Sequence, residues 1–122
     1  MKTNLFIVGA AKCGTTSFHE YLSQHPDINM SLIKETNFFS NEQLKNDNLY
    51  YSGINICENT NDYLNCFSPN SNAEIQGESS VSYLYYSNSA KRIYNYNSNA
   101  KILIFLRNPV DRAISHYLMD FN

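Results

Sequence analysis

The chain has 122 residues, of which 43% are hydrophobic, so it is long enough for one domain with a buried core and is not compositionally disordered. Its formal net charge of −2 does not indicate a nucleic-acid-binding protein. The three cysteines show no Cys-x-x-Cys spacing, and this odd count favours reduced thiols over a disulfide framework. No signal peptide or membrane-spanning run precedes the first apolar segment, so a cytoplasmic protein without a membrane span is expected.

Hydrophobic patterning predicts strands that alternate with helices. We expect strands at 4–9, 28–32, 73–78 and 101–106, helices at 15–24, 58–67, 83–95 and 109–120, and a loop with a short helix at 35–47. Such alternation predicts an α/β fold with a parallel sheet, in which ligands bind beyond the carboxyl ends of the strands. Lys12, Glu78 and Arg107 each follow a predicted strand, so all three are expected to line that edge.

Two expectations concern burial. In the first helix, Phe18, Tyr21 and Leu22 stand at i, i+3 and i+4, which predicts the face that packs on the sheet. The run 101–106 is apolar throughout, which is typical of a strand buried on both faces of a sheet.

The first strand leads into a loop that suits phosphate binding, within the segment LFIVGAAKCGTTS at residues 5–17. Loop amides and a helix N-terminus can point at an anion, and a lysine adds positive charge. The order differs from the G-x-x-x-x-G-K-[ST] loop of ATP and GTP sites. The glycines keep their spacing, but Thr15 stands where that lysine belongs and Lys12 precedes Gly14. Either Thr15 or Thr16 is expected to cap the helix.

Further motifs follow along the chain. Residues 34–39 read K-E-T-N-F-F, and Gly77 and Glu78 open a G-E-S-S segment. The strand at 101–106 ends in Arg-Asn-Pro, and Ser115 stands eight residues after Arg107. Together with the K-C-G-T-T loop, these segments resemble the sulfotransferases that use 3′-phosphoadenosine 5′-phosphosulfate (PAPS), with more likeness to the carbohydrate and bacterial branches than to the cytosolic branch that sulfates phenols and steroids.

The resemblance implies a three-layer P-loop fold, similar to that of nucleotide kinases, with a central parallel sheet that is incomplete here. Residues 1–122 would be the N-terminal part of a single sulfotransferase domain. The implied reaction moves a sulfuryl group from PAPS to a hydroxyl acceptor, with a carbohydrate as the suggested acceptor class. No metal is implied, because PAPS has no β,γ-phosphate pair for Mg²⁺ to bridge.

The resemblance also implies roles for individual residues. Lys12 would stabilise the leaving group, and Glu35 would be the general base, with Glu78 as an alternative base. Arg107 and Ser115 would hold the 3′-phosphate. The 5′-phosphosulfate would lie against a loop that comprises Lys12, Cys13, Gly14, Thr15, Thr16 and Ser17. By contrast, His19, His25 and His116 share no metal-ligand spacing, and none of them is expected to be catalytic.

Two other functions stay open at this point. A P-loop nucleotide or small-molecule kinase would need an acidic metal ligand where the strand at 101–106 instead ends in Arg107 and Asn108. A catalytically incompetent nucleotide-binding fragment is the third interpretation. The last helix carries an apolar face that we expect to be only partly covered, formed by Ile114, Tyr117, Leu118 and Phe121. The isolated chain is therefore not expected to catalyse transfer, and the acceptor and the oligomeric state stay undetermined.

Overall fold

In a computed structural model of the chain, the structure describes residues 2–47, 55–69 and 71–121. These residues contain the strands β1 (Leu5–Gly9), β2 (Ile28–Met30), β3 (Ile75–Ser79) and β4 (Lys101–Ile104). The strands form one sheet in the order β2-β3-β1-β4, and each neighbouring pair is parallel. The predicted parallel α/β sheet is therefore confirmed.

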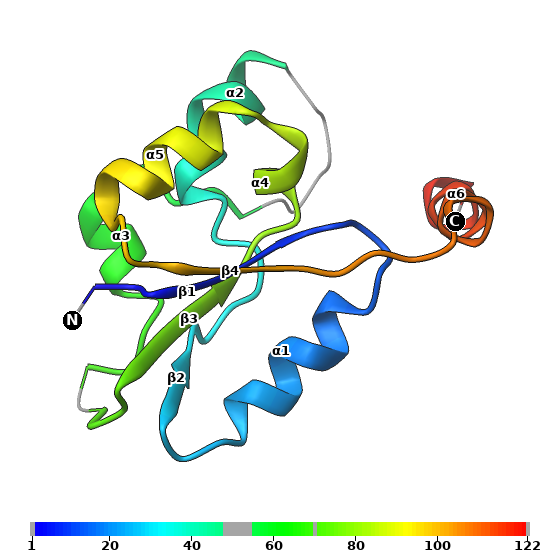
Figure 1. Ribbon diagram of the computed structural model, residues 1–122. Coiled ribbons are helices and arrows are strands. Elements are labelled where there is room, and N and C mark those ends of the chain that lie inside the picture. The colour runs from blue at the N-terminus through cyan, green and yellow to red at the C-terminus, as the bar shows by residue number, and fades with distance from the viewer. Residues whose placement is uncertain (1, 48–54, 70, 122) are drawn as a thin grey trace.

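The helices lie on both sides of this sheet. They are α1 (Thr15–Ser23), the 3-10 helix η1 (Phe38–Ser40), α2 (Asn41–Asn46), α3 (Thr60–Leu64), α4 (Ser82–Tyr85), α5 (Asn88–Tyr96) and α6 (Pro109–Phe121). Figure 1 shows α1 on one side of the sheet and the group α2 to α5 on the other. Helix α6 follows β4 and lies well away from the other helices (Figure 1).

An aromatic cluster joins β1 to the group α2 to α5. Phe6 of β1 is fully buried and lies edge-on to Phe39 and Tyr83, with ring centroids 5.6 Å and 6.4 Å apart. Tyr63 of α3 completes the cluster through an edge contact with Phe39. Burial of each such ring stabilises the fold by roughly 1.5–3 kcal/mol, so this cluster fixes the position of β1 and of the segments that follow η1.

The structure corrects two predictions about the helices. The continuous helix expected at 83–95 is wrong, because Tyr86 takes an extended conformation between α4 and α5. The face predicted for α1 is wrong for Tyr21, which is 70% exposed, although Phe18 packs on Phe105 with ring centroids 4.7 Å apart and Leu22 is half-buried. The buried residues of the helix are instead Thr15 and His19. Helix α1 turns its Thr15–His19 side to the sheet because the ring of His19 finds polar partners there, a possibility that apolar spacing cannot reveal.

The strand β4 is not buried on both faces as predicted. Within the described part of the chain it is an edge strand whose one pairing is with β1, and the Ile104 side chain is 52% exposed. An apolar run has the same appearance in a central strand and in an edge strand, so the sequence pattern could not distinguish them.

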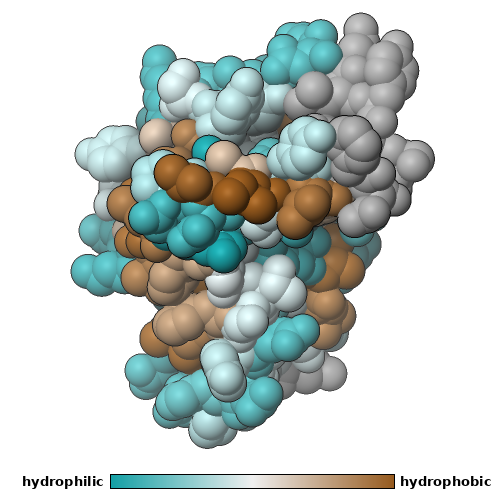
Figure 2. Space-filling model, turned by 90° about the vertical axis from the view of Figure 1, so that its right-hand side faces the viewer, coloured by the Kyte–Doolittle hydropathy of each residue, from teal (hydrophilic) through white to brown (hydrophobic). Residues whose placement is uncertain are grey.

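Helix α6 begins at Pro109 as predicted, and its apolar side chains are exposed. Val110, Ile114 and Leu118 are each more than half exposed. Figure 2 shows hydrophobic residues in a band across the face of the molecule that carries α6. The partly covered apolar face expected for this helix is confirmed for its described residues. No helix in the described part of the chain has the length and apolar character needed to span a membrane.

Candidate active site

The loop between β1 and α1 has the geometry of an anion site. Gly14 is the N-cap of α1 with a left-handed φ of 85°, and no side chain makes a capping hydrogen bond, so the predicted threonine cap is wrong. A Cβ on Gly14 would meet no atom within 4 Å, so glycine serves the backbone conformation here and does not relieve a close contact. The amides of the first helical turn have no intrahelical partner. Because no side chain caps them either, these amides are suited to bind a phosphate.

The structure brings Arg107 to this loop. Its guanidinium Nη1 donates a hydrogen bond of 3.3 Å to the backbone carbonyl of Lys12. The chain after β4 runs beside the loop, since Ala10 N donates to Phe105 O and Phe105 N donates to Gly9 O, each at 2.8 Å. Two of the cationic residues selected from the sequence are therefore neighbours beyond the carboxyl ends of β1 and β4.

Among the described residues, no hydrogen bond links Ser115 to Arg107, in contrast to the bond between Arg107 and the Lys12 carbonyl. Ser115 lies half-buried on α6. Cys13 is half-buried within the loop, with its thiol Sγ 3.5 Å from the carbonyl oxygen of Ala11.

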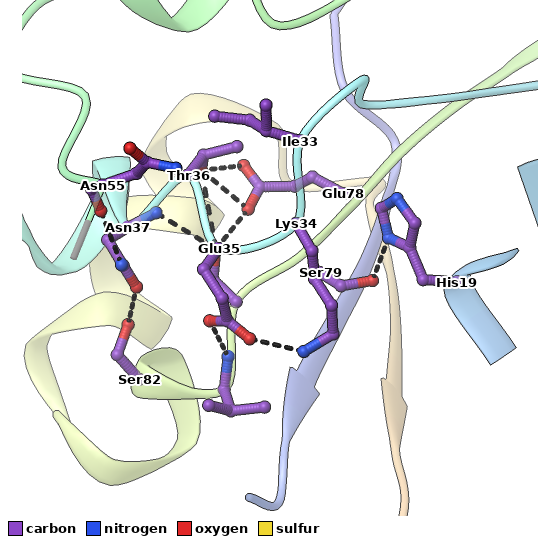
Figure 3. A network of polar contacts seen from close by, with 12 residues as sticks. His19, Ile33, Lys34, Glu35, Thr36, Asn37, Asn55, Glu78, Ser79 and Ser82 are labelled. Atoms are coloured by element: carbon purple, nitrogen blue, oxygen red, sulfur yellow. Dashed lines mark hydrogen bonds and ion pairs between the residues drawn. The ribbon is translucent and has the colours of Figure 1, made fainter. Parts of the chain in front are cut away.

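Glu35 lies beyond the carboxyl end of β3. Its amide donates to the carbonyl of Ser79 at 2.7 Å, and its carboxylate Oε2 accepts from the amide of Val81 at 2.9 Å. The other oxygen, Oε1, forms an ion pair with Lys34 Nζ at 2.5 Å (Figure 3). The Glu35 side chain is 30% exposed, so the carboxylate is held in place while it can still contact a ligand.

Glu78 occupies a different environment and does not line the edge of the sheet, which corrects the prediction. It lies within β3 and is fully buried, and both of its carboxylate oxygens lie 3.0 Å from Thr36 Oγ1. The hydroxyl of Ser80 donates to Oε1 at 2.9 Å. Burial raises the pKa of Glu78, although hydrogen bonds from surrounding hydroxyl groups act against this. A carboxyl group that is fully buried and hydrogen-bonded in this way is suited to a structural role in the core.

The sequence analysis missed His19. Its ring nitrogen Nδ1 lies 2.7 Å from Ser79 Oγ, and Nε2 lies 3.1 Å from the carbonyl oxygen of Ser31 (Figure 3 shows the Ser79 contact). Burial lowers the pKa of this imidazole. The sequence carried one signal for a role of His19. It stands four residues after Thr15, which places both residues on one side of α1.

Left-handed backbone conformations gather at this site. Among the described residues other than glycine, Lys12, Glu35 and Asn37 have positive φ angles of 62°, 64° and 54°. Asparagine tolerates this region, but lysine and glutamate rarely adopt it. Backbone strain of this kind concentrates at functional sites, where the surrounding structure holds it in place.

No group of three or more His, Cys, Asp or Glu side chains within the described residues is arranged to hold a metal ion. Beyond the strand ends the structure joins Arg107 to the backbone of Lys12, and Lys34 to Glu35. These residues supply positive charge and one carboxylate beside the first-turn amides of α1, which suits the transfer of an anionic group.

Comparisons with known proteins agree with this chemistry. The family model described as a sulfotransferase domain matches residues 2–122. A crystal structure of a sulfotransferase from Alicyclobacillus acidocaldarius is 44% identical and superposes with a TM-score of 0.83, covering 98% of this chain and 50% of that one. The membrane-associated sulfotransferase kil1 of Dictyostelium discoideum is 32% identical over 93% of this chain and 22% of its own length. Human carbohydrate sulfotransferase 15 is 27% identical over 94% of this chain and 27% of its own length. The chain thus spans about a quarter of these curated relatives.

Proposed function

Because this chain belongs to the sulfotransferase domain family, we propose that it carries the donor-binding elements of an enzyme that transfers a sulfuryl group from PAPS to a hydroxyl acceptor. The observation that carries this proposal is the contact between Arg107 and the backbone of Lys12. It joins two cationic motifs, far apart in sequence, beside the uncapped N-terminus of α1.

The loop would hold the 5′ side of the donor. The amides of Gly14, Thr15 and Thr16 would bind the 5′-phosphosulfate, and the first-turn hydroxyls, with Ser17 beside them, add donors. Lys12 would approach the oxygen that bridges sulfur and phosphorus, where negative charge develops as the bond breaks. A cation fixed there stabilises the transition state more than the ground state.

Arg107 would bind the 3′-phosphate, because a guanidinium can donate two parallel hydrogen bonds to a phosphate. Ser115 would add a hydroxyl donor from α6. This pair would distinguish PAPS from adenosine 5′-phosphosulfate, which lacks the 3′-phosphate.

Glu35 would be the general base. In the transfer step, the acceptor oxygen forms a bond to sulfur, the bond from sulfur to the 5′-phosphate oxygen breaks, and the acceptor proton passes to the Glu35 carboxylate. The products are the sulfate ester and adenosine 3′,5′-bisphosphate (PAP). The exposure of Glu35 and the complete burial of Glu78 support this choice between the two carboxylates.

For the acceptor we propose a carbohydrate hydroxyl. The names of several relatives support this class, among them carbohydrate sulfotransferase 15 and heparan sulfate glucosamine 3-O-sulfotransferase 6. Incubating the protein with PAPS and matched panels of sugars and phenols would test it. Transfer to phenols alone would contradict it.

Nucleotide preference tests the donor assignment directly. Calorimetric titration should show tighter binding of PAP than of adenosine 5′-phosphosulfate, and tighter binding of PAP than of ATP with Mg²⁺. A preference for ATP with Mg²⁺ would contradict the proposal and support the kinase interpretation. Binding of PAP without measurable transfer would support the interpretation of the isolated chain as a nucleotide-binding fragment.

A further inference from the structure

His19 is a buried titratable side chain that the proposed reaction does not use. It lies on the side of α1 that packs against the sheet, one turn after the helix begins at Thr15, and it is 6% exposed. Burial of a polar group without hydrogen bonds destabilises a folded protein. The contacts of both ring nitrogens therefore explain why a histidine can occupy this position.

These contacts define the protonation state of the ring. A backbone carbonyl can only accept, so Nε2 carries the proton that is donated to Ser31 O at 3.1 Å. In a neutral imidazole, Nδ1 is then the acceptor, and the hydroxyl of Ser79 donates to it at 2.7 Å. His19 thus uses each nitrogen for a different strand, since Ser31 directly follows β2 and Ser79 ends β3.

The two partners of His19 hold the two ends of the segment 31–35. At its start, Ser31 also donates its hydroxyl to the carbonyl of Ile33 at 2.6 Å. At its end, the Ser79 carbonyl accepts from the amide of Glu35 at 2.7 Å. Figure 3 shows the ring beside Ser79, at the base of the loop that presents Glu35.

We propose that His19 is a positioning residue that ties α1, and with it the phosphate-binding loop, to the segment 31–35 that presents Lys34 and Glu35. One side chain thereby sets the donor-binding loop and the candidate base in register. This inference rests on the proposed role of Glu35 as the base.

The charges around the ring favour the neutral form that this geometry needs. Burial is the main cause that lowers the pKa of His19, and the nearby Lys34 lowers it further, while the bond to the Ser31 carbonyl and the charges of Glu35 and Glu20 raise it. The net effect is a pKa below the ordinary value of 6.5, so the ring is neutral at pH 7 and Nδ1 stays an acceptor.

The test measures hydrogen exchange at individual amides of the chain by NMR. His19→Phe fills a similar space without polar contacts, whereas His19→Asn keeps a polar group near the position of Nδ1. His25→Phe is the matched control, because His25 is exposed just beyond the same helix. The internal reference is the Ser80 amide, which donates to Ile7 O at 3.0 Å on the neighbouring strand and not to the segment 31–35. Nitrogen-15 spectra of the ring report its tautomer.

We expect protection of the Glu35 amide to fall about 10-fold or more in His19→Phe, the scale of one or two lost hydrogen bonds. His19→Asn should restore part of it, and the Ser80 amide and the His25→Phe variant should be unchanged. Unchanged protection of Glu35 in His19→Phe overturns the proposal, as does an equal loss at Ser80, which would mean that His19 only stabilises the fold. A ring protonated on Nδ1 alone also overturns it.

If His19→Phe does not fold, Ser79→Ala decides the question. This variant removes the hydroxyl that contacts His19 and keeps the carbonyl that holds Glu35. Loss of protection at Glu35 supports the proposal, and full protection overturns it. None of these readouts needs turnover, so failure of the proposed sulfuryl transfer, tested by Glu35→Gln, would be seen separately.

Discussion

The sheet has two unlike regions. The strands β2, β3 and β1 carry helices on both faces, and the buried aromatic cluster and the polar contacts of Thr36, Glu78 and His19 lie among them. The strand β4 and helix α6 form the second region, with one neighbouring strand and largely exposed apolar side chains. Lys12 and Glu35 belong to the first region, and Arg107 and Ser115 belong to the second.

From this difference we infer that the two sides of the proposed donor site rest on parts of unequal local stability. Regions with few buried apolar contacts open at lower free-energy cost than core strands. We therefore expect the loop proposed to bind the 5′-phosphate, and Glu35, to be fixed before the donor binds. The proposed 3′-phosphate contacts should depend more on the donor itself to bring β4 and α6 into place.

The largest expected effect is the difference in free energy of unfolding between a variant of the first region and a variant of the second. Phe6→Ala removes a fully buried ring from β1 and should lower the free energy of unfolding by about 3–5 kcal/mol. Ile104→Ala on β4 should lower it by about 1 kcal/mol or less, since that side chain is half-exposed. Urea unfolding of both variants gives the two values. Similar losses would mean that β4 is as well packed as β1.

Next in size is the role of Lys12 in the first region. In a form of the protein that shows transfer, Lys12→Ala should slow turnover about 100-fold or more, the scale for one lost oxyanion donor. Lys91→Ala on the exposed side of α5 removes the same charge elsewhere and should leave turnover unchanged. Near wild-type turnover in Lys12→Ala would remove this lysine from the mechanism.

Glu35→Gln should slow transfer by about 100-fold or more, because the amide cannot accept the acceptor proton. PAP affinity should be unchanged, since the base does not contact the nucleotide in the proposed step. Steady-state rates and calorimetry give the two quantities. Should Glu78→Gln show this pattern while Glu35→Gln does not, the roles of the two carboxylates would have to be exchanged.

The second region is tested through ligand selectivity. Arg107→Ala should weaken PAP binding by about 2 kcal/mol, because a charged hydrogen-bond donor to the 3′-phosphate is lost. Binding of adenosine 5′-phosphosulfate should hardly change. Lys101→Ala, at the opposite end of β4, is the charge-matched control. Equal losses for both nucleotides would contradict a contact with the 3′-phosphate.

The smallest expected effect is a pH dependence within the core. Burial raises the pKa of Glu78 above its ordinary value of 4.5. The stability that protonated Glu78 contributes is therefore complete below pH 4.5, the ordinary value, and is lost as the pH rises through the pKa of the folded state. Glu78→Gln should therefore gain stability relative to the natural chain as the pH increases from about 5 to 8. Thermal unfolding across this range measures it, and parallel curves for the two proteins would contradict it.

The motifs could be predicted from the sequence because they combine local backbone chemistry with residue type. The loop at Lys12 and Gly14 and the strand-to-helix turn at Arg107 were placed correctly beyond the strand ends. The burial of Glu78 and the partners of His19 could not be predicted, because they depend on pairing between segments about 40 to 60 residues apart. The edge position of β4 depends on strand order, which apolar patterning does not encode.

The left-handed residues Lys12 and Glu35 have a consequence for protein engineering. Replacing Lys12 by glycine removes the Cβ that disfavours a positive φ, which relieves roughly 1–2 kcal/mol, more than the entropy that glycine adds to the unfolded chain. Replacing Glu35 by glycine also breaks its ion pair with Lys34 and its hydrogen bond from Val81. The same changes delete the proposed leaving-group cation and the proposed base. A selection for thermal stability alone would thus favour loss of the proposed leaving-group cation at Lys12 and retention of the proposed base at Glu35. At Lys12, stability and the proposed activity oppose each other, a trade-off that is typical of sites shaped for chemistry.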